Sequence, residues 1–235
     1  MADAPVLLLS CEHASNRIPR EYLHLFHGCR ALLAGHQAYD AGALACARGI
    51  GRRLQAPLIA ASYSRLLVDL NRSPGHPAQF SMRTRTLPQE EKRRVIARYY
   101  QPHRMRVERW VAARIARGRR VVHVAVHSFV PALDGVTRRA DIGLLYDPGR
   151  HTESALCRRW RDALRETGNK LLAVRRNYPY RGVSDGLTRH LRSRFPVSRY
   201  TGIELEINQN RLRGDRARER LSALLATTLR RALLE

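Results

Sequence analysis

Two histidines stand where strand-like segments end, and their placement suits a metal site. His13 follows the apolar run Val6–Leu9 after a short link, while His127 closes a run rich in valine. In open α/β sheets, ligand and catalytic sites lie at the ends of strands. Catalytic zinc takes three nitrogen or oxygen ligands and leaves a fourth position for water. For each histidine taken singly, the alternative is an imidazole that only completes the core or the surface.

Two carboxylates alternate with apolar residues in the segment Ile203–Ile207, where Glu204 and Glu206 flank Leu205. A strand with this pattern places both carboxylates on one face, roughly 7 Å apart. They could form a solvated pair on an outward face. However, the apolar residues predict that the opposite face is buried, and acids on such a strand usually have partners or a chemical role.

An amide and a guanidinium stand together at the exit of another apolar segment. Asp69 and Leu70 lead into Asn71 and Arg72, and a polar cluster follows them. A planar guanidinium beside an amide suits the bidentate capture of a carboxylate. Because arginine is so common in this chain, only the pairing at a strand exit gives Arg72 weight.

Composition limits the class of protein. The chain has 235 residues, 44% hydrophobic and 27% charged, which suits one domain with a buried core. No apolar stretch approaches the roughly 20 residues needed to span a bilayer, and we expect no signal peptide. The four cysteines share no C-x-x-C spacing, so we expect reduced thiols and a cytoplasmic protein.

The charge is strongly positive, since 43 Lys and Arg residues stand against 20 acids and give a net charge of +23. Such a value suggests nucleic acid, anionic lipid or an acidic substrate as partner. Only Lys92 and Lys170 are lysines, and the arginines spread along the whole chain, which indicates a bias in residue choice rather than one basic face. Aromatic residues make up 6%, so platforms for stacking bases are scarce. Nucleic-acid binding is therefore the alternative and not the first interpretation.

Strand-like and helical segments alternate, which predicts an α/β layered fold, and we expect a single domain over residues 1–235. Strands are expected at Pro5–Cys11, Pro57–Ser62, Leu66–Leu70, Arg120–Val126, Ile142–Tyr146, Lys170–Val174 and Gly202–Ile207. Helices are expected at Ala31–Leu54, Pro88–Arg117 with a kink or break at Pro102, Thr152–Glu166 ended by Gly168, and Asp215–Leu234. The segment Arg176–Arg199, rich in Pro, Gly, Asn and Ser, is expected to be irregular and functional.

Six short segments carry a resemblance to a known family. They are Ser10–Asn16, Tyr39–Ala43, Ser64–Arg72, His127–Phe129, Asn177–Tyr180 and Gly202–Asn208. In this order they resemble the N-formylglutamate amidohydrolase family, and they cover most of residues 5–210. That family is related in fold to zinc carboxypeptidases and aspartoacylases. The resemblance therefore implies a three-layer α/β sandwich with a mixed central sheet, and a single catalytic Zn²⁺.

The resemblance implies that His13 and His127 are the imidazole ligands of this zinc. Carboxypeptidases and aspartoacylases have a glutamate three residues after the first histidine, whereas this chain has Asn16, a poor zinc ligand. We expect Asp40, in the Tyr-Asp-Ala-Gly segment, to supply the carboxylate. Glu12 is the alternative: a continuing strand would point it away from His13, but a turn after the first strand would remove that objection.

The expected reaction is metal-assisted hydrolysis of a formamide or a similar N-acyl bond. Zinc lowers the pKa of its water to about 7. Glu206, with Glu204 as the alternative, would take the proton and return it to the leaving amine. Arg65 would stabilise the negative charge on the tetrahedral oxygen.

The expected substrate is a small acidic N-acyl amino acid such as N-formylglutamate, which would place the enzyme in histidine degradation. The resemblance implies that Asn71 and Arg72 hold the α-carboxylate, and Tyr180 is expected to cover the substrate. The acyl group, the amino acid and the oligomeric state stay open. A zinc carboxypeptidase or amidase with a larger substrate is the alternative within the same fold, and a basic nucleic-acid-binding protein is the alternative outside it.

Overall fold

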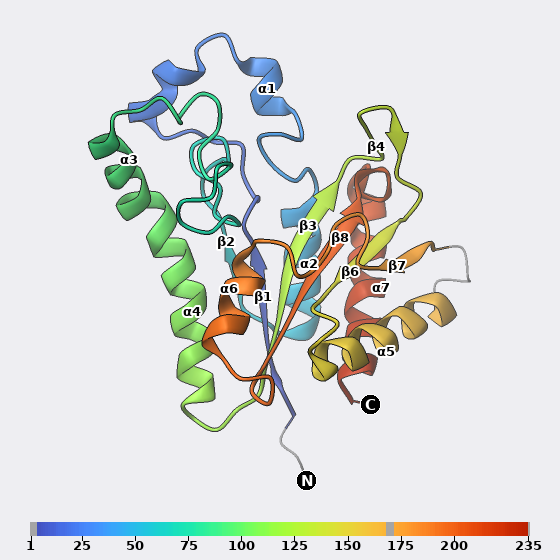
Figure 1. Ribbon diagram of the computed structural model, residues 1–235. Helices are drawn as coiled ribbons and strands as arrows, with labels where there is room; N and C mark the ends of the chain where they lie inside the picture. Colours follow the sequence, from blue (N-terminus) through green and yellow to red (C-terminus); the bar gives the residue numbers. More distant parts are fainter. Residues whose placement is uncertain (1–3, 168–171, 235) are drawn as a thin grey trace.

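Strand β3 (Val121–Phe129) lies inside a six-stranded sheet, and all 9 of its residues are buried. The computed structural model describes residues 4–167 and 172–234. The strand order is β2 (Leu58–Ala60), β1 (Val6–Cys11), β3, β8 (Tyr200–Asn208), β6 (Ile142–Leu145) and β7 (Val174–Arg176) (Figure 1). The antiparallel pairing of β6 with β8 makes the sheet mixed. Because helices cover both faces of this sheet, a central strand such as β3 is buried on both faces, and six of its nine residues are apolar.

Besides the six-stranded sheet, the fold contains a small hairpin and seven described α-helices. A small hairpin pairs β4 (Ala132–Leu133) with β5 (Val136–Thr137). The α-helices are α1 (Arg30–Ala34), α2 (Ala43–Leu54), α3 (Gln89–Val95), α4 (Gln101–Ile115), α5 (His151–Thr167), α6 (Leu187–Arg194) and α7 (Asp215–Leu234). Within residues 4–167 and 172–234, none of the helices has the length and apolar character needed to cross a membrane.

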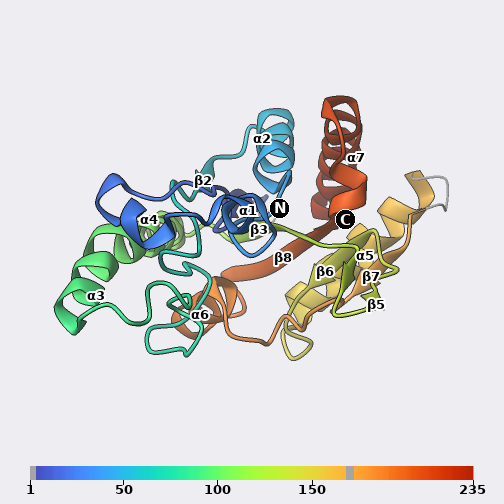
Figure 2. The ribbon, with the colours of Figure 1, turned by 90° about the horizontal axis from the view of Figure 1, so that it is seen from above.

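Helices α2 and α7 lie on one side of the sheet, and α4 and α6 lie on the other (Figure 2). Helix α5 packs against α7, where Trp160 Nε1 donates to Thr228 Oγ1 at 3.1 Å. Three side chains of β8, Ile203, Leu205 and Ile207, belong to the core beneath α2, α5 and α7. Glu204 and Glu206 therefore point to the opposite face, the side of α6. The expected burial of the apolar face of this strand is confirmed, as are the α/β class, the helical layers and the mixed sheet.

The strand that carries His127 is longer than predicted. The expected strand Arg120–Val126 continues to Phe129, so His127 and Ser128 belong to β3 itself. By contrast, β1 ends at Cys11, and the next two residues form a turn. The residues before and after His127 are thus part of the sheet. His13 lies in a turn, so its position depends on the contacts that this turn makes.

The prediction of one helix over Ala31–Leu54 is wrong, because α1 and α2 are separated by residues 35–42. Gly42 has a φ of +80°, and a Cβ at this position would lie 2.8 Å from Leu212 Cβ. Glycine allows this left-handed turn into α2 where other residues would be strained. The interruption places Asp40 in a loop and not on a helix.

The prediction of a strand over Leu66–Leu70 is also wrong. The segment forms turns, with Leu67 N donating to Ser64 O at 3.0 Å. Its apolar side chains Leu67, Val68 and Leu70 are buried in a cluster beside β1 and β2. A short apolar run is compatible with any buried backbone, and here turns satisfy the backbone groups.

The expected helix Pro88–Arg117 consists of α3, a π-helical segment Ile96–Tyr100 (η2) and α4. Gln101 N donates to Ile96 O, five residues earlier, so the helix widens just before Pro102. Proline has no N–H to give to the preceding turn, and the wider turn accommodates that loss without ending the helix.

Two further expectations concern the carboxyl-terminal half. Of the predicted strand Lys170–Val174, residues 170 and 171 lie outside the described residues, as does Gly168, and the strand found in this region is β7. The segment Arg176–Arg199 is not wholly irregular, because it contains α6. That helix buries Leu187 and Leu191 against α4, a long-range contact that its polar sequence hides.

Candidate active site

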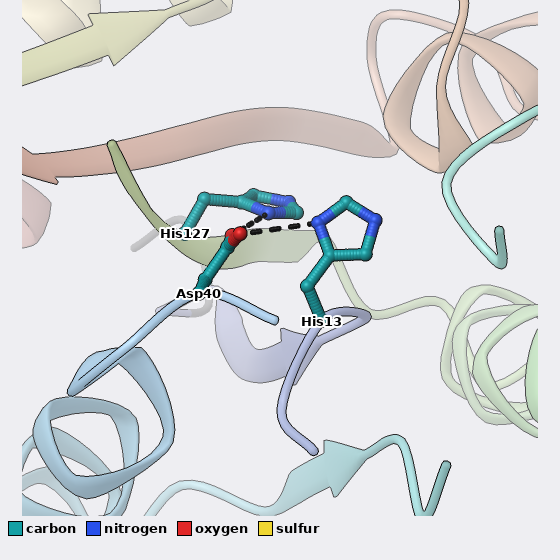
Figure 3. A group of neighbouring side chains, drawn as sticks. All are labelled: His13, Asp40 and His127. Atoms are coloured by element: carbon teal, nitrogen blue, oxygen red, sulfur yellow. Dashed lines mark hydrogen bonds and ion pairs between the residues drawn. The ribbon is translucent and has the colours of Figure 1, made fainter. Parts of the chain in front are cut away.

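His13, Asp40 and His127 converge from three parts of the chain: the turn after β1, the loop before α2 and the end of β3 (Figure 3). Asp40 Oδ2 lies 3.4 Å from His13 Nδ1 and 2.9 Å from His127 Nδ1. The two imidazole ring centroids are 5.0 Å apart. Since zinc holds each nitrogen or oxygen ligand at about 2.0–2.2 Å, donors this close together can share one ion.

The loop that carries Asp40 is fixed by the backbone of His13. Asp40 N donates to His13 O at 2.9 Å, and Ala43 N donates to Asp40 O at 3.1 Å at the start of α2. Ser128 N also donates to Asp40 Oδ2 at 3.3 Å. The carboxylate is therefore anchored to both strand ends that supply the histidines.

The second nitrogen of each imidazole faces another buried carboxylate. His13 Nε2 lies 2.7 Å from Asp69 Oδ1, and His127 Nε2 lies 3.2 Å from Glu12 Oε2. Carboxylates in this position fix the orientation of metal-binding histidines and select the ring nitrogen that faces the metal. Glu12 thus contacts His127 on the ring edge opposite to Asp40. Two carboxylates were candidates for the third ligand. Asp40 lies near Nδ1 of both histidines, whereas Glu12 lies near Nε2 of His127, on the other side of that ring.

The electrostatics of this group favour a cation. Burial raises the pKa of Asp40, but His13 and His127 outweigh burial and hold that pKa well below its ordinary value. Burial also raises the pKa of Glu12, and its contacts with His103 and His127 reverse the direction and lower it. For His127, burial lowers the pKa, while Asp40 and Glu12 raise it further than burial lowers it. Two imidazoles and a carboxylate, surrounded by further buried carboxylates, form a donor set that suits a zinc ion.

The two glutamates of β8 differ in their partners. Glu206 is the register partner of His127 in the parallel pair β3–β8, and its Oε2 has no hydrogen-bond partner in the part of the chain that the structure describes. Glu204 Oε1 accepts a hydrogen bond from Thr188 Oγ1 on α6. Burial raises the pKa of Glu206 to about 8. With exposed fractions of 9% for Glu204 and 5% for Glu206, neither belongs to a solvated pair.

Arg65 lies at the edge of the metal group. Its Nε and Nη2 donate to Asp69 Oδ2 at 3.2 and 2.7 Å, which fixes the guanidinium plane. Nη1 lies 3.2 Å from His13 Nδ1 and 3.7 Å from Asp40 Oδ1. The guanidinium group of Arg65 is therefore close enough to interact with a substrate oxygen that binds beside the histidines.

A cavity of about 250 Å³ opens over this group and brings together all the candidate residues. It is lined by His13, Asp40, Arg65, Asn71, Arg72, His127, Ser128, Tyr180, Arg181, Ser184, Asp185, Glu204 and Glu206. The candidate residues come from loops and strands that are far apart in sequence, so their convergence is a property of the fold.

The predicted substrate-binding residues line the cavity, and their side chains differ in hydrogen bonding and exposure. Asn71 Oδ1 accepts from Leu187 N at 2.7 Å, at the start of α6. Arg72 Nη1 donates to Asp185 O at 3.2 Å. Tyr180 is 44% exposed, and its hydroxyl accepts a hydrogen bond from Arg138 Nη1 at 3.0 Å.

Sequence reasoning missed several residues of this site. Asp69 was seen only as part of the lead into Asn71, yet its carboxylate contacts both His13 and Arg65. Arg181 and Asp185 also line the cavity. The segment that contains them was expected to be functional, but only Tyr180 was predicted to contact the substrate. A carboxylate at the end of an apolar run was the available signal for Asp69.

The family model for N-formylglutamate amidohydrolase matches residues 5–212. The chain belongs to this family. A comparison with curated protein sequences found no match. The crystal structure of gene product Atu2144 from Agrobacterium tumefaciens is 32% identical, with a TM-score of 0.83 over 98% of this chain and 91% of that chain. The N-formylglutamate amidohydrolase from Ralstonia eutropha JMP134 is 21% identical, with a TM-score of 0.70 over 98% of this chain and 94% of that chain, and shares the fold. Family membership identifies the chain as an amidohydrolase.

Proposed function

We propose that this protein is a zinc-dependent hydrolase that cleaves the amide bond of a small N-acyl amino acid, with N-formylglutamate as the first candidate substrate. The observation that carries the proposal is the cavity in which His13, Asp40 and His127 lie beside Glu206. Family membership supports the amide bond as the one cleaved. A volume of about 250 Å³ suits a small substrate better than a peptide or a glycan.

His13, Asp40 and His127 would hold the metal, through Nδ1 of each histidine and the carboxylate of Asp40. Bound zinc would supply a water of lowered pKa and polarise the acyl oxygen. Asp69 is hydrogen-bonded to the outer nitrogen of His13, and Glu12 lies 3.2 Å from the outer nitrogen of His127, so both rings already face a carboxylate on the side away from the proposed metal.

Glu206 is the residue of choice for moving the proton. Glu206 lines the cavity as the register neighbour of His127, and one of its carboxylate oxygens has no hydrogen-bond partner among the described residues, whereas Glu204 accepts a hydrogen bond from Thr188. Burial raises the pKa of Glu206 toward neutrality, which suits a group that accepts a proton and then donates it to the leaving amine. The positive charge of Arg65 lies where it can stabilise negative charge on the acyl oxygen.

The α-carboxylate of the substrate would bind to Asn71 and Arg72, and Tyr180 would cover it. Tyr100 Oη donates to Arg72 O at 2.7 Å and Arg104 Nη1 donates to Leu70 O at 3.0 Å, so the loop that carries this pair is held from the helix behind it. Because the loop is already held, less ordering of the loop is needed when the substrate binds.

The test is a hydrolysis screen of the metal-analysed protein over N-formyl, N-acetyl and N-carbamoyl derivatives of Glu, Asp and Gln. We expect turnover of at least one N-acyl amino acid, with N-formylglutamate the best substrate. His127→Ala should lose turnover while retaining the circular dichroism of the fold, and His24→Ala, an exposed histidine outside the cavity, should retain turnover. Full turnover in His127→Ala, or no turnover of any N-acyl amino acid by the zinc-saturated protein, would contradict the proposal.

A further inference from the structure

Arg181 lines the same cavity as the proposed metal ligands. Within residues 4–167 and 172–234, no carboxylate pairs with its guanidinium group. The cavity's other guanidinium groups are held in place: Arg65 by Asp69, and Arg72 by one hydrogen bond to Asp185 O. Of these, Arg72 also has no carboxylate partner in the described ranges.

The backbone around Arg181 is pinned on both sides. Asn177 Oδ1 accepts from Tyr146 N at 3.0 Å and from Gly182 N at 3.1 Å, which closes the loop 177–182. A Cβ at Gly182 would lie 2.1 Å from Tyr146 N, so glycine is required for this close approach. The backbone of the loop that carries Tyr180 and Arg181 is therefore held in place.

A buried ion pair also anchors the loop 177–182. Arg192 Nη1 donates to Gly182 O, and Arg192 Nε lies 3.0 Å from Glu153 Oε1 in the interior. Because the loop backbone is anchored this way, little ordering of the loop is needed when a ligand binds to Arg181.

The nearby acids do not serve as partners for Arg181. Asp185 accepts hydrogen bonds from the backbone and the hydroxyl of Ser73, and Glu204 accepts from Thr188. As far as the described residues show, the cavity thus contains two guanidinium groups, those of Arg72 and Arg181, that lie on separate loops and have no carboxylate partner. Two such groups suit one ligand that carries two carboxylates.

We propose that Arg181 binds the side-chain carboxylate of the substrate, while Arg72 binds the α-carboxylate, and that Arg181 thereby sets the preference for an acidic amino acid. This assignment rests on the proposed hydrolase function. A site that offers a charged partner to one substrate group discriminates against a substrate that lacks the group, because the partner is then left unpaired.

The experiment compares kcat/KM for N-formyl-L-glutamate and N-formyl-L-glutamine, a neutral substrate of nearly the same shape. The wild type should prefer the glutamate substrate by roughly 10- to 100-fold, the value of a hydrogen bond to a charged group. Arg181→Gln should lose that preference through a higher KM for the glutamate substrate, while kcat/KM for the glutamine substrate stays within about twofold. Arg189→Gln, an exposed arginine of α6 outside the cavity, should leave both values unchanged.

A binding measurement keeps this assignment separate from the reaction. Calorimetry should show that the wild type binds glutarate more tightly than its monoamide, 4-carbamoylbutyrate, and that Arg181→Gln binds the two alike. If glutarate behaves so but no N-acyl amino acid is hydrolysed, the proposed function fails and the role of Arg181 stands. Equal losses on both substrates in Arg181→Gln, or an unchanged preference for glutarate, would overturn the role of Arg181.

Discussion

Glu206 on β8 and His127 on β3 are direct neighbours across the parallel pair of strands that forms the floor of the cavity. Both side chains are almost completely buried, at 5% and 2% exposure. Register partners in a parallel pair of strands lie side by side with their side chains on the same face of the sheet. The candidate metal ligand and the candidate base are therefore held by the same two strands. Glu204 is instead the register partner of Ala125 and accepts a hydrogen bond from Thr188, so the two glutamates of β8 have different surroundings.

Replacing Glu206 by Gln should lower kcat by roughly 10²- to 10⁴-fold, because the base is lost while the shape of the side chain is kept. Glu204→Gln, which can retain a hydrogen bond to Thr188, should cost much less. Steady-state kinetics of both variants at matched metal content test this. A larger loss in Glu204→Gln would assign the base to Glu204.

Replacing Asp69 by Asn should weaken metal binding by about 10- to 100-fold, because the carboxylate that orients His13 becomes a neutral amide. Competition with a chelator measures the affinity, and thermal unfolding reports whether the loop stays folded. Asp162→Asn, half exposed and paired with Arg161, serves as the matched control. Equal affinities in Asp69→Asn and the control would show that Asp69 does not support the metal site.

Replacing Tyr100 by Phe should raise KM with little change in kcat, because the hydroxyl that holds Arg72 O is removed from the loop that binds the substrate. The loss of one hydrogen bond, about 0.5–1.5 kcal/mol, corresponds to roughly a 2- to 10-fold change in KM. Tyr99→Phe, whose hydroxyl contacts Glu21 instead, is the control. A fall in kcat at constant KM would argue against a role in positioning the substrate.

Stability should depend on pH through His123, which is buried between Ser10 and Tyr200. Burial lowers the pKa of His123 to about 4 in the folded state, below the ordinary value near 6.5. Between these values the unfolded chain binds more protons, so the contribution of His123 to stability is complete above about pH 6.5 and is lost as the pH falls toward 4.

His123→Gln isolates this effect, because the other titrating groups are common to both proteins. The difference in unfolding free energy between wild type and variant should shrink on going from pH 7 to pH 5, by up to about 3 kcal/mol over the full window. Denaturant unfolding at several pH values measures it. Parallel curves for the two proteins would show that His123 does not titrate in this range.

Much of the fold could be predicted because local patterns and burial agree there. The valine-rich strand, the alternating Ile203–Ile207 segment and the closing helix Asp215–Leu234 each bury the face that their periodicity marks. The candidate site residues also come together in one cavity, since strand ends and the loops next to them meet at one edge of the sheet. Their chemical roles remain predictions.

What the sequence could not reveal depends on long-range contacts. The buried run at Leu67 forms turns, because its hydrogen-bond partners lie within the loop and not on a neighbouring strand. The role of Asp69 depends on His13, 56 positions away, and the uncommitted state of Arg181 depends on which acids already have partners. Neither local propensity nor spacing contains that information.

The metal content of the gently purified protein is the most direct measurement of the central claim. About one zinc per chain is expected in the wild type, from three donors that converge on one position, and His127→Ala should contain almost none while remaining folded. A folded wild type that binds no divalent ion after dialysis against zinc, or a His127→Ala variant that retains a full equivalent, would contradict the account.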